Sequence, residues 1–462
     1  MRIQIGDVAL QYSASRPWAC ALVLTLSLVG PSLLVGQRRG DPNRDPNRRD
    51  RLPPPGAPPE EAPASVLEDR SGLATEAPTG FDNLTNGYTP QGPAFETLNE
   101  ENVQPLRSFN DNRFVFEESE GIEDGLGPTY NAQSCRECHQ SVVTGGASQI
   151  AEHRTGHSSD GIFTESLGGT LIQSRAIHPD IVEKVSQDDN VRTFRISTNT
   201  LGGGFVEAVP NGALLAIRDN QPAEMRGTAV LVPVLEAGGA LRIGRFGWKG
   251  QHASLVSFSA DAYLNEMGVT SPWLAEENSA SGLFVGWGSK YDAVEDPEDD
   301  GEDVVAFAEF MRSTKAPSRG AITPDVLDGE VTFRQIGCAV CHVETLQTAP
   351  AGVAVNGGQL TVPAALGDKL IHPYSDFLLH DVGTGDGIAT LAGDEYAATA
   401  NQMRTAPLWS LRTRNRLMHD GLSFTAQEAI ERHAGQAAAV TRRYRELSDQ
   451  QRNALLAFLA SL

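Results

Sequence analysis

The spacing of apolar residues predicts helices in the later part of the chain. The segments "DVVAFAEFMRS" and "NALLAFLASL" each carry apolar residues at helical spacing on one face. The first face consists of Val304, Val305, Ala308 and Met311, and the second of Leu455, Phe458, Leu459 and Leu462. Thr323 before Pro324 is typical of the N-cap and first position of another helix. Ser448 and Gln451 form a capping box ahead of the C-terminal helix.

Strand-like patterns lie in the middle of the chain. Between Val191 and Gly247, short apolar runs such as "GALLAI" and "AVLVPVL" are separated by Gly, Pro and Asn, which is typical of strands and turns. We therefore expect a mainly helical protein in which some β-strand is inserted into the first half.

The N-terminal residues show no pattern of a folded domain. Residues 1–36 contain Arg16 and then an apolar run, which is the layout of a secretory signal peptide or, if it stays uncleaved, of an N-terminal anchor. Residues 37–79 are rich in Pro, Arg, Asp and Glu and predict a disordered linker. We expect a periplasmic or otherwise exported protein, with membrane contact only through an uncleaved anchor.

The charge of the chain excludes one class of partner. Among 462 residues there are 37 Lys and Arg and 59 Asp and Glu, which gives a net charge of −22. Nucleic-acid binding needs clustered basic residues, so we expect no nucleic-acid partner. The acidic run "VEDPEDDGED" predicts a solvated loop, with a calcium site as the less common alternative.

Four of the five cysteines lie in two copies of one motif, C-x-x-C-H. The copies are Cys135, Cys138 and His139, and Cys338, Cys341 and His342. Two cysteines three apart and a following histidine predict covalent attachment of a haem c whose iron the histidine binds. A structural zinc would leave both histidines unexplained, and a redox dithiol would need a βαβ setting that the flanking sequence lacks. We therefore expect two covalently bound haem c groups.

The residue in the sixth position of each iron decides between electron transfer and chemistry on peroxide or oxygen. Among the histidines and methionines, His433 has the most favourable position. Thr425 and Glu428 form a capping box in front of it, and Ala429 and Ile430 would share its helical face. We predict that His433 binds the second iron.

Several blocks of sequence resemble the bacterial di-haem oxidoreductase family, formerly labelled thiol oxidoreductases. They include "GPTYNAQSCRECHQ", "GRFGWKGQHASL", "YLNEMGVTS", "YSDFLLHDVGTGDG", "RTAPLWSLRTRNRLMHDG" and "TAQEAIERHAGQA". That family is similar to the di-haem cytochrome c peroxidases and to the di-haem enzyme that matures methylamine dehydrogenase. The resemblance implies two cytochrome c-like haem domains, at 80–315 with a large insert and at 316–462.

The resemblance also implies roles for single residues. The "HDG" at 419–421 is similar to the peroxidase motif that precedes the distal ligand of the second haem by fourteen residues, an offset that gives His433. Trp248 in "WKGQHASL" resembles the aromatic residue between the haems. Glu266 in "NEMG" resembles the acid/base over the peroxidatic iron, whereas the accompanying glutamine of the peroxidases falls on or near Phe258.

The distal ligand of the first iron is the least defined position. Peroxidases carry a displaceable histidine in a Gly-His pair some sixteen residues after the C-x-x-C-H. His157 in "RTGHSS" is the predicted counterpart and His153 the alternative. Neither offset fits, so an open iron is the third interpretation.

Together these features predict an exported di-haem oxidoreductase of peroxidase type, in which electrons pass from the second haem to a peroxide-reactive first haem. A small redox protein or another donor would supply the electrons, peroxide would be the substrate, and calcium would be a further cofactor. The alternatives are an electron-transfer cytochrome without a substrate and an oxidase of a partner protein.

Overall fold

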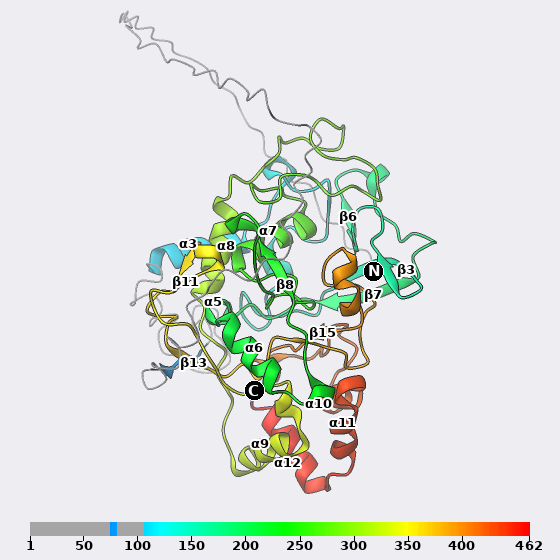
Figure 1. The fold of residues 1–462 in the computed structure, drawn as a ribbon. Coiled ribbons are helices and arrows are strands. Elements are labelled where there is room, and N and C mark those ends of the chain that lie inside the picture. The colour runs from blue at the N-terminus through cyan, green and yellow to red at the C-terminus, as the bar shows by residue number, and fades with distance from the viewer. Residues whose placement is uncertain (1–73, 81–105) are drawn as a thin grey trace, which may run out of the picture. The chain divides into compact units, whose positions relative to one another are not determined.

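Helices and short strands alternate along the folded part of the chain (Figure 1). The structure is a computed structural model that describes residues 74–80 and 106–462. The predicted signal or anchor and most of the predicted linker lie outside the described residues, as do residues 81–105. In the part that the structure describes, no helix has the length and apolar character needed to span a bilayer.

The helices are distributed over both halves. The described α-helices are α3 (Leu106–Glu117), α4 (Cys135–Cys138), α5 (Gly203–Ala208), α6 (Asn211–Asn220), α7 (Leu255–Ala262), α8 (Glu302–Arg312), α9 (Pro324–Ile336), α10 (Ala426–Glu431), α11 (Ala438–Arg445) and α12 (Asp449–Leu459). A π-helix, Tyr263–Met267, continues α7, and a 3-10 turn, Cys338–Val340, follows α9. The predictions of Thr323 as N-cap and of the Ser448 capping box are confirmed, because each side chain accepts the expected backbone N–H.

The strands are short and numerous. They are β1 (Thr75–Glu76), β2 (Thr129–Tyr130), β3 (Ala151–Ser159), β4 (Ile162–Thr164), β5 (Leu171–Ile172), β6 (Arg175–Ala176), β7 (Val191–Ile196), β8 (Leu231–Val234), β9 (Ala240–Ile243), β10 (Leu346–Gln347), β11 (Ala354–Val355), β12 (Leu360–Thr361), β13 (Lys369–Ile371), β14 (Leu379–His380) and β15 (Met403–Arg404). Strands β10 to β15 lie in the second half, where none was expected. The mainly helical class is therefore confirmed only in part.

Two local predictions in the first half had different outcomes. "AVLVPVL" contains β8, as predicted, but "GALLAI" lies inside the helix α6. A short apolar run has no period that separates a strand from a buried helix, and here the helix buries Leu214. On α8, Val305 is 40% exposed, and Phe307 takes its place in the apolar face.

Strand β3 organises the largest sheet. It pairs antiparallel with β4, β5 and β7, and β3 and β7 lie side by side in Figure 1. In this register Glu152 lies opposite Arg195, and His153 lies opposite Phe194. The sheet covers one side of the region that holds the first C-x-x-C-H.

Residues of the predicted linker also take part in the fold. In β1, Thr75 and Glu76 pair in parallel with Lys369 and Leu370 of β13. At least this end of the segment 37–79 therefore has a defined place, against residues of the second predicted domain.

Each cysteine motif packs against its own hydrophobic core. Phe116, Tyr263 and Phe307 belong to a core of α3, α7 and α8 that contacts Cys135. A second core, formed largely by α9 and α12, contacts Cys338 and Cys341. These two helices approach closely at Gly329, where a Cβ atom would lie 2.0 Å from the Ala454 carbonyl oxygen. The fold thus provides two separate apolar settings, one for each motif.

Candidate functional site

The first motif lines a cavity of about 530 Å³. Cys135 and Cys138 form the single turn of α4, and His139 follows directly. The cavity wall also contains Trp248 and Glu266. Its volume lies within the range of about 300–1,000 Å³ that is usual for cofactor and ligand pockets.

The second motif lines a different and more apolar cavity of about 190 Å³. Cys338, Cys341 and His342 face it together with His433, which follows α10. Ala429 and Ile430 line it as well, so the predicted inward face is confirmed. The cavities hold one cysteine pair each, so the two pairs do not come together as the shared zinc site would require.

Hydrogen bonds fix the tautomers of the three histidines that the sequence assigns to iron. The Nδ1 atoms of His139, His342 and His433 lie 3.2, 2.9 and 2.7 Å from the carbonyl oxygens of Gly146, Tyr374 and Ala429. A carbonyl only accepts, so Nδ1 carries the proton and donates it. The unprotonated Nε2 is then free to bind a metal, as in metal-binding histidines in general.

The rings of His342 and His433 lie near one another across the second cavity. Burial, and after it the charge of His433, lowers the pKa of His342 to about 4. Burial likewise lowers the pKa of His433. Both rings are therefore neutral at physiological pH, which is the form that binds iron.

Two arginines line the second cavity, the buried Arg404 and the partly buried Arg414, and neither forms an ion pair among the described residues. The Nε atom of Arg414 makes no hydrogen bond, and the Arg404 side chain donates only to the carbonyl oxygens of Gly247 and Thr405. Burial, together with the charge of Arg414, lowers the pKa of Arg404 to about 10, although the charge of Asp376 opposes this shift, and burial lowers the pKa of Arg414 to about 10. Buried charges are normally paired, so this cavity is suited to an anion. The carboxylates of a haem would supply it, and the residues present therefore fit that group.

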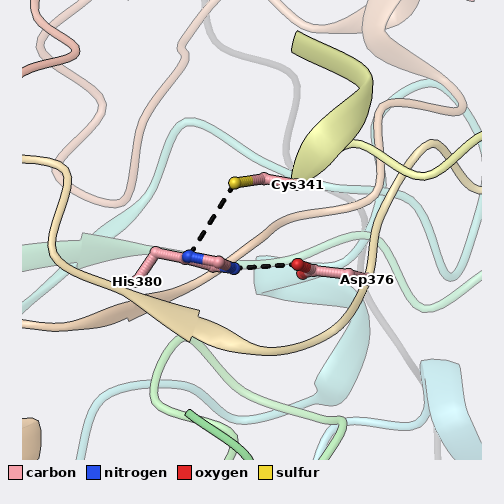
Figure 2. A group of neighbouring side chains, drawn as sticks. All are labelled: Cys341, Asp376 and His380. Atoms are coloured by element: carbon pink, nitrogen blue, oxygen red, sulfur yellow. Dashed lines mark hydrogen bonds and ion pairs between the residues drawn. The ribbon is translucent and has the colours of Figure 1, made fainter. Parts of the chain in front are cut away.

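Figure 2 shows a hydrogen-bonded group beside the second motif. The Nε2 atom of His380 lies 2.8 Å from a carboxylate oxygen of Asp376, and its Nδ1 atom lies 3.8 Å from the sulfur of Cys341. His380 and Asp376 are fully buried. These three residues could hold a metal ion only while the sulfur is free. Attachment of a haem would use that sulfur, so we assign the group to the wall of the second cavity.

Trp248 lines both cavities. Its indole N–H donates to the carbonyl oxygen of Ile196 at 2.7 Å, and its ring packs edge-on against His419 at a centroid distance of 6.2 Å. The side chain is buried. The structure thus brings Trp248 to the position between the two motifs that the resemblance implied.

Glu266 lies on the π-helix and is held by the loop that carries β2. Its backbone carbonyl accepts from the N–H groups of Asn131 and Ala132 at 2.7 and 3.0 Å, and its carboxylate accepts from the Asn131 amide at 3.0 Å. Burial, and then the negative charge of Glu152, raises the pKa of Glu266 well above its usual range. The raised pKa favours the acid form, which can donate a proton.

The two candidate distal histidines lie differently with respect to the first cavity. The ring of His157 is exposed, and its Nδ1 atom lies 2.7 Å from the carbonyl oxygen of Asp188. The ring of His153 stacks on Phe194 at 4.8 Å, although the residue borders the cavity. Phe258 lines the cavity where the peroxidases have glutamine.

Sequence reasoning missed two residues of the first cavity, Glu152 and Arg154. Both lie on β3, and the guanidinium of Arg154 donates to both carboxylate oxygens of Glu152, at 2.7 and 3.1 Å. The only sequence signal for this pair is the alternation of opposite charges in "AEHRTGH". That pattern does not show that the pair lies near Glu266, because the strand and the π-helix meet only in the folded chain.

The acidic loop forms a cluster instead of a fully solvated segment. Carboxylate oxygens of Glu277, Asp292, Asp296 and Glu298 lie within 4.8 Å of one another. Burial and the neighbouring carboxylates raise the pKa of Glu277 to about 10, and burial raises that of Glu298 to about 7. The expectation of calcium stays a prediction.

Comparison with known proteins gives one family and several distant structures. A family model described as "Di-haem oxidoreductase, putative peroxidase" matches residues 173–462. Hydrazine synthase of Kuenenia stuttgartiensis is 14% identical, with 92% of this chain and 100% of that chain covered and a TM-score of 0.36. A MauG-like protein associated with microbial copper homeostasis is 14% identical, with 84% and 94% covered and a TM-score of 0.37. The diheme peroxidase BthA from Burkholderia thailandensis is 14% identical, with 67% and 94% covered and a TM-score of 0.29. No curated protein matches the chain.

Proposed function

The chain belongs to the di-haem oxidoreductase family, whose model covers residues 173–462, and from this premise we propose that it is an exported c-type di-haem enzyme that reduces peroxide. The observation that carries this proposal is the position of Trp248, which lines both the apolar cavity of the second motif and the polar cavity of the first. The second cavity is lined by both His342 and His433, whereas the first offers the acid Glu266 beside His139, and the His153 ring at its border is stacked on Phe194. This asymmetry is what a division into electron transfer and substrate chemistry requires.

The residues that would hold the two haems are the two motifs and His433. Cys135 and Cys138 would attach the first haem, with His139 on its iron. Cys338 and Cys341 would attach the second, between His342 and His433. When bound, the haems would supply the redox chemistry, with peroxide binding at the first iron and electrons entering through the second.

Glu266 would provide the proton. Reduction of hydrogen peroxide to two waters consumes two protons and two electrons, so a donor of protons has to face the substrate. Glu266 and Cys138 line the same cavity, so the carboxyl group borders the space beside the first attachment site. Its raised pKa favours the acid form.

Trp248 would lie on the route of the electrons, and its hydrogen bond to Ile196 would hold the indole in place. A small redox protein or another external donor would reduce the second haem. The N-terminal pattern supports export. The proposed haem c groups and donor support it as well, because haem c attachment and such donors belong to exported compartments. Calcium would be an additional ion, without a role in these steps.

The experiment that tests the function uses the purified full chain with its haems attached. We expect a mass increase equal to two haems, resistance of both to acid extraction, and consumption of peroxide when a reduced donor is present. Purely low-spin ferric spectra without any change on addition of peroxide would favour an electron-transfer cytochrome. A long-lived oxidised species in the absence of a small reductant would favour oxidation of a partner protein.

Replacing Arg414 with Leu is expected to lower the midpoint potential of the second haem. The variant removes one of two positive charges that line its cavity, which makes addition of an electron less favourable by an amount on the order of 1 kcal/mol or more. Spectroelectrochemical titration measures this shift. Arg414→Lys keeps the charge and should retain most of the potential. Equal potentials in the wild-type and Leu proteins would contradict the assignment.

A further inference from the structure

The first cavity contains two carboxyl groups that interact directly, Glu152 and Glu266. Glu152 is on β3, and Glu266 is on the π-helix after α7. Both side chains line this cavity, and a hydrogen bond between the two carboxyl groups acts on the pKa of each, so a proton can be shared between them. The inference below rests on the proposed function, because it concerns the proton that Glu266 would deliver.

Glu152 is the member of the pair that is held as an anion. Two nitrogens of Arg154 bind the two oxygens of Glu152, and the third nitrogen of that guanidinium donates to the hydroxyl of Thr170 at 3.0 Å. Burial alone would raise the pKa of Glu152, but the charge of Arg154 and the hydrogen bonds from Glu266 and Arg154 lower it below its usual range. A bidentate arginine stabilises the ionised form of a carboxylate strongly.

Glu266 is the member that is held in the acid form. One of its oxygens accepts from the Asn131 amide, whose own oxygen accepts from the Ser174 N–H at 2.9 Å, so the amide cannot turn. The neighbouring anion of Glu152 makes ionisation of Glu266 unfavourable, because two adjacent carboxylates cannot both be charged without a large cost. In such a pair the two environments assign one group as anion and the other as acid.

Other charged groups around the pair come from several elements. Arg195 on β7 lies opposite Glu152 and is itself paired with Asp386 at 2.7 Å. Asp261 on α7 lines the cavity and is paired with His252 at 3.0 Å. Glu137 on α4 and Arg175 on β6 also line it and are paired with each other at 3.3 Å. The charge of Arg154 acts as well on Glu165, in the turn after β4. The carboxylates of Glu137 and Asp261 thus have partners of their own.

We propose that Glu152 is a positioning residue that, held ionised by Arg154, accepts the hydrogen bond of Glu266 and keeps the proton for peroxide on Glu266. In the step it serves, the O–H bond of Glu266 and the O–O bond of peroxide break, and the proton of Glu266 completes the first water. The other oxygen becomes the second water with two electrons from the external donor of the proposed function and one further proton from solvent. The carboxylate of Glu266 then takes a proton back from solvent, and its repulsion from Glu152 drives this return.

The test is an infrared titration of the resting ferric protein, full-length and with haems attached, in the absence of peroxide. A protonated carboxyl group has its own carbonyl band, which shifts in D₂O, and the band that Glu266→Gln removes is that of Glu266. We expect this band in the wild-type protein at neutral pH. In Glu152→Gln its midpoint should move to lower pH by about one unit or more, because the neighbouring charge is lost. The pH limit of peroxide consumption should move in parallel.

Glu165→Gln is the matched control, since it removes the same charge next to Arg154 without touching Glu266. The Glu266 midpoint in Glu165→Gln should equal that of the wild type. In Glu152→Asp, which keeps the charge, the Glu266 midpoint should lie closer to the wild-type value than in Glu152→Gln. Absence of the Glu266 band at neutral pH overturns the inference, as do equal midpoints in Glu152→Gln and Glu165→Gln. If Glu152→Gln fails to fold, Glu152→Asp takes its place in the test. The inference is then overturned if the Glu266 midpoint in Glu152→Asp is as low as expected for an uncharged residue at position 152. If the Glu266 midpoint shifts in Glu152→Gln but the wild-type protein consumes no peroxide, the interaction of Glu152 with Glu266 is supported and the proposed function is contradicted.

Discussion

Replacing Glu266 with Gln is expected to slow the reaction with peroxide at neutral pH by about a hundredfold or more. Gln has nearly the same shape and keeps an oxygen that can accept from Asn131, but it has no proton to give. The loss therefore measures the proton transfer and not the fold of the π-helix. Stopped-flow mixing of the haem-loaded protein with peroxide, followed by absorbance, gives the rate constant.

The pH profile adds a second criterion to the Glu266 variant. In the wild type the rate should fall as the pH rises through the raised pKa of Glu266, because the acid form is the reactive one. In Glu266→Gln this limb should disappear, whereas Glu165→Gln should retain it. A loss of only a few-fold, with the limb intact, would leave Glu266 as a structural residue of the cavity.

Replacing His433 with Ala is expected to leave both haems attached and to turn one of the two from low-spin to high-spin. Attachment depends on the cysteines, which the variant does not change, whereas His433 is the histidine that faces His342 with a free Nε2 atom. Loss of a strong axial ligand leaves an iron with a weak or open sixth position. Absorption and electron spin resonance spectra of the ferric protein count the low-spin and high-spin centres.

The controls for His433 are the two distal candidates of the first iron. His153→Ala and His157→Ala should leave the spectra unchanged, since one ring stacks on Phe194 and the other hydrogen bonds at the surface. An unchanged spectrum in His433→Ala would assign the second iron to another side chain of the same cavity. Met403, Met418 and His419 line that cavity and are the residues to test next.

The outcome for the helix of His433 shows where sequence reasoning was reliable. Thr425 caps α10 as predicted, but the carboxylate of Glu428 accepts from the N–H of Phe424 and not from that of Thr425. The helix ends at Glu431, so His433 lies just beyond it. Capping signals act over three or four residues and are therefore visible in the sequence. The exact end of a helix depends on contacts from outside it, here the hydrogen bond from Thr441 to the His433 carbonyl.

The sequence by itself determined the two motifs, the haem attachment that they predict and much of the helical framework. Attachment and proximal binding need residues at fixed short spacings, and short spacings are written directly in the chain. The identity of Trp248 and Glu266 came from the resemblance, because nothing in their local sequence separates them from ordinary core and surface residues.

Only the tertiary structure decided which groups act together. It joined Glu152 and Arg154 to Glu266, placed Trp248 against both cavities, and brought Arg404 and Arg414 to the wall of the second cavity. These residues come from strands, turns and a π-helix that are distant in sequence. The pairing of distant segments depends on the packing of the whole core, and the proton and charge balance of the site depends on that pairing.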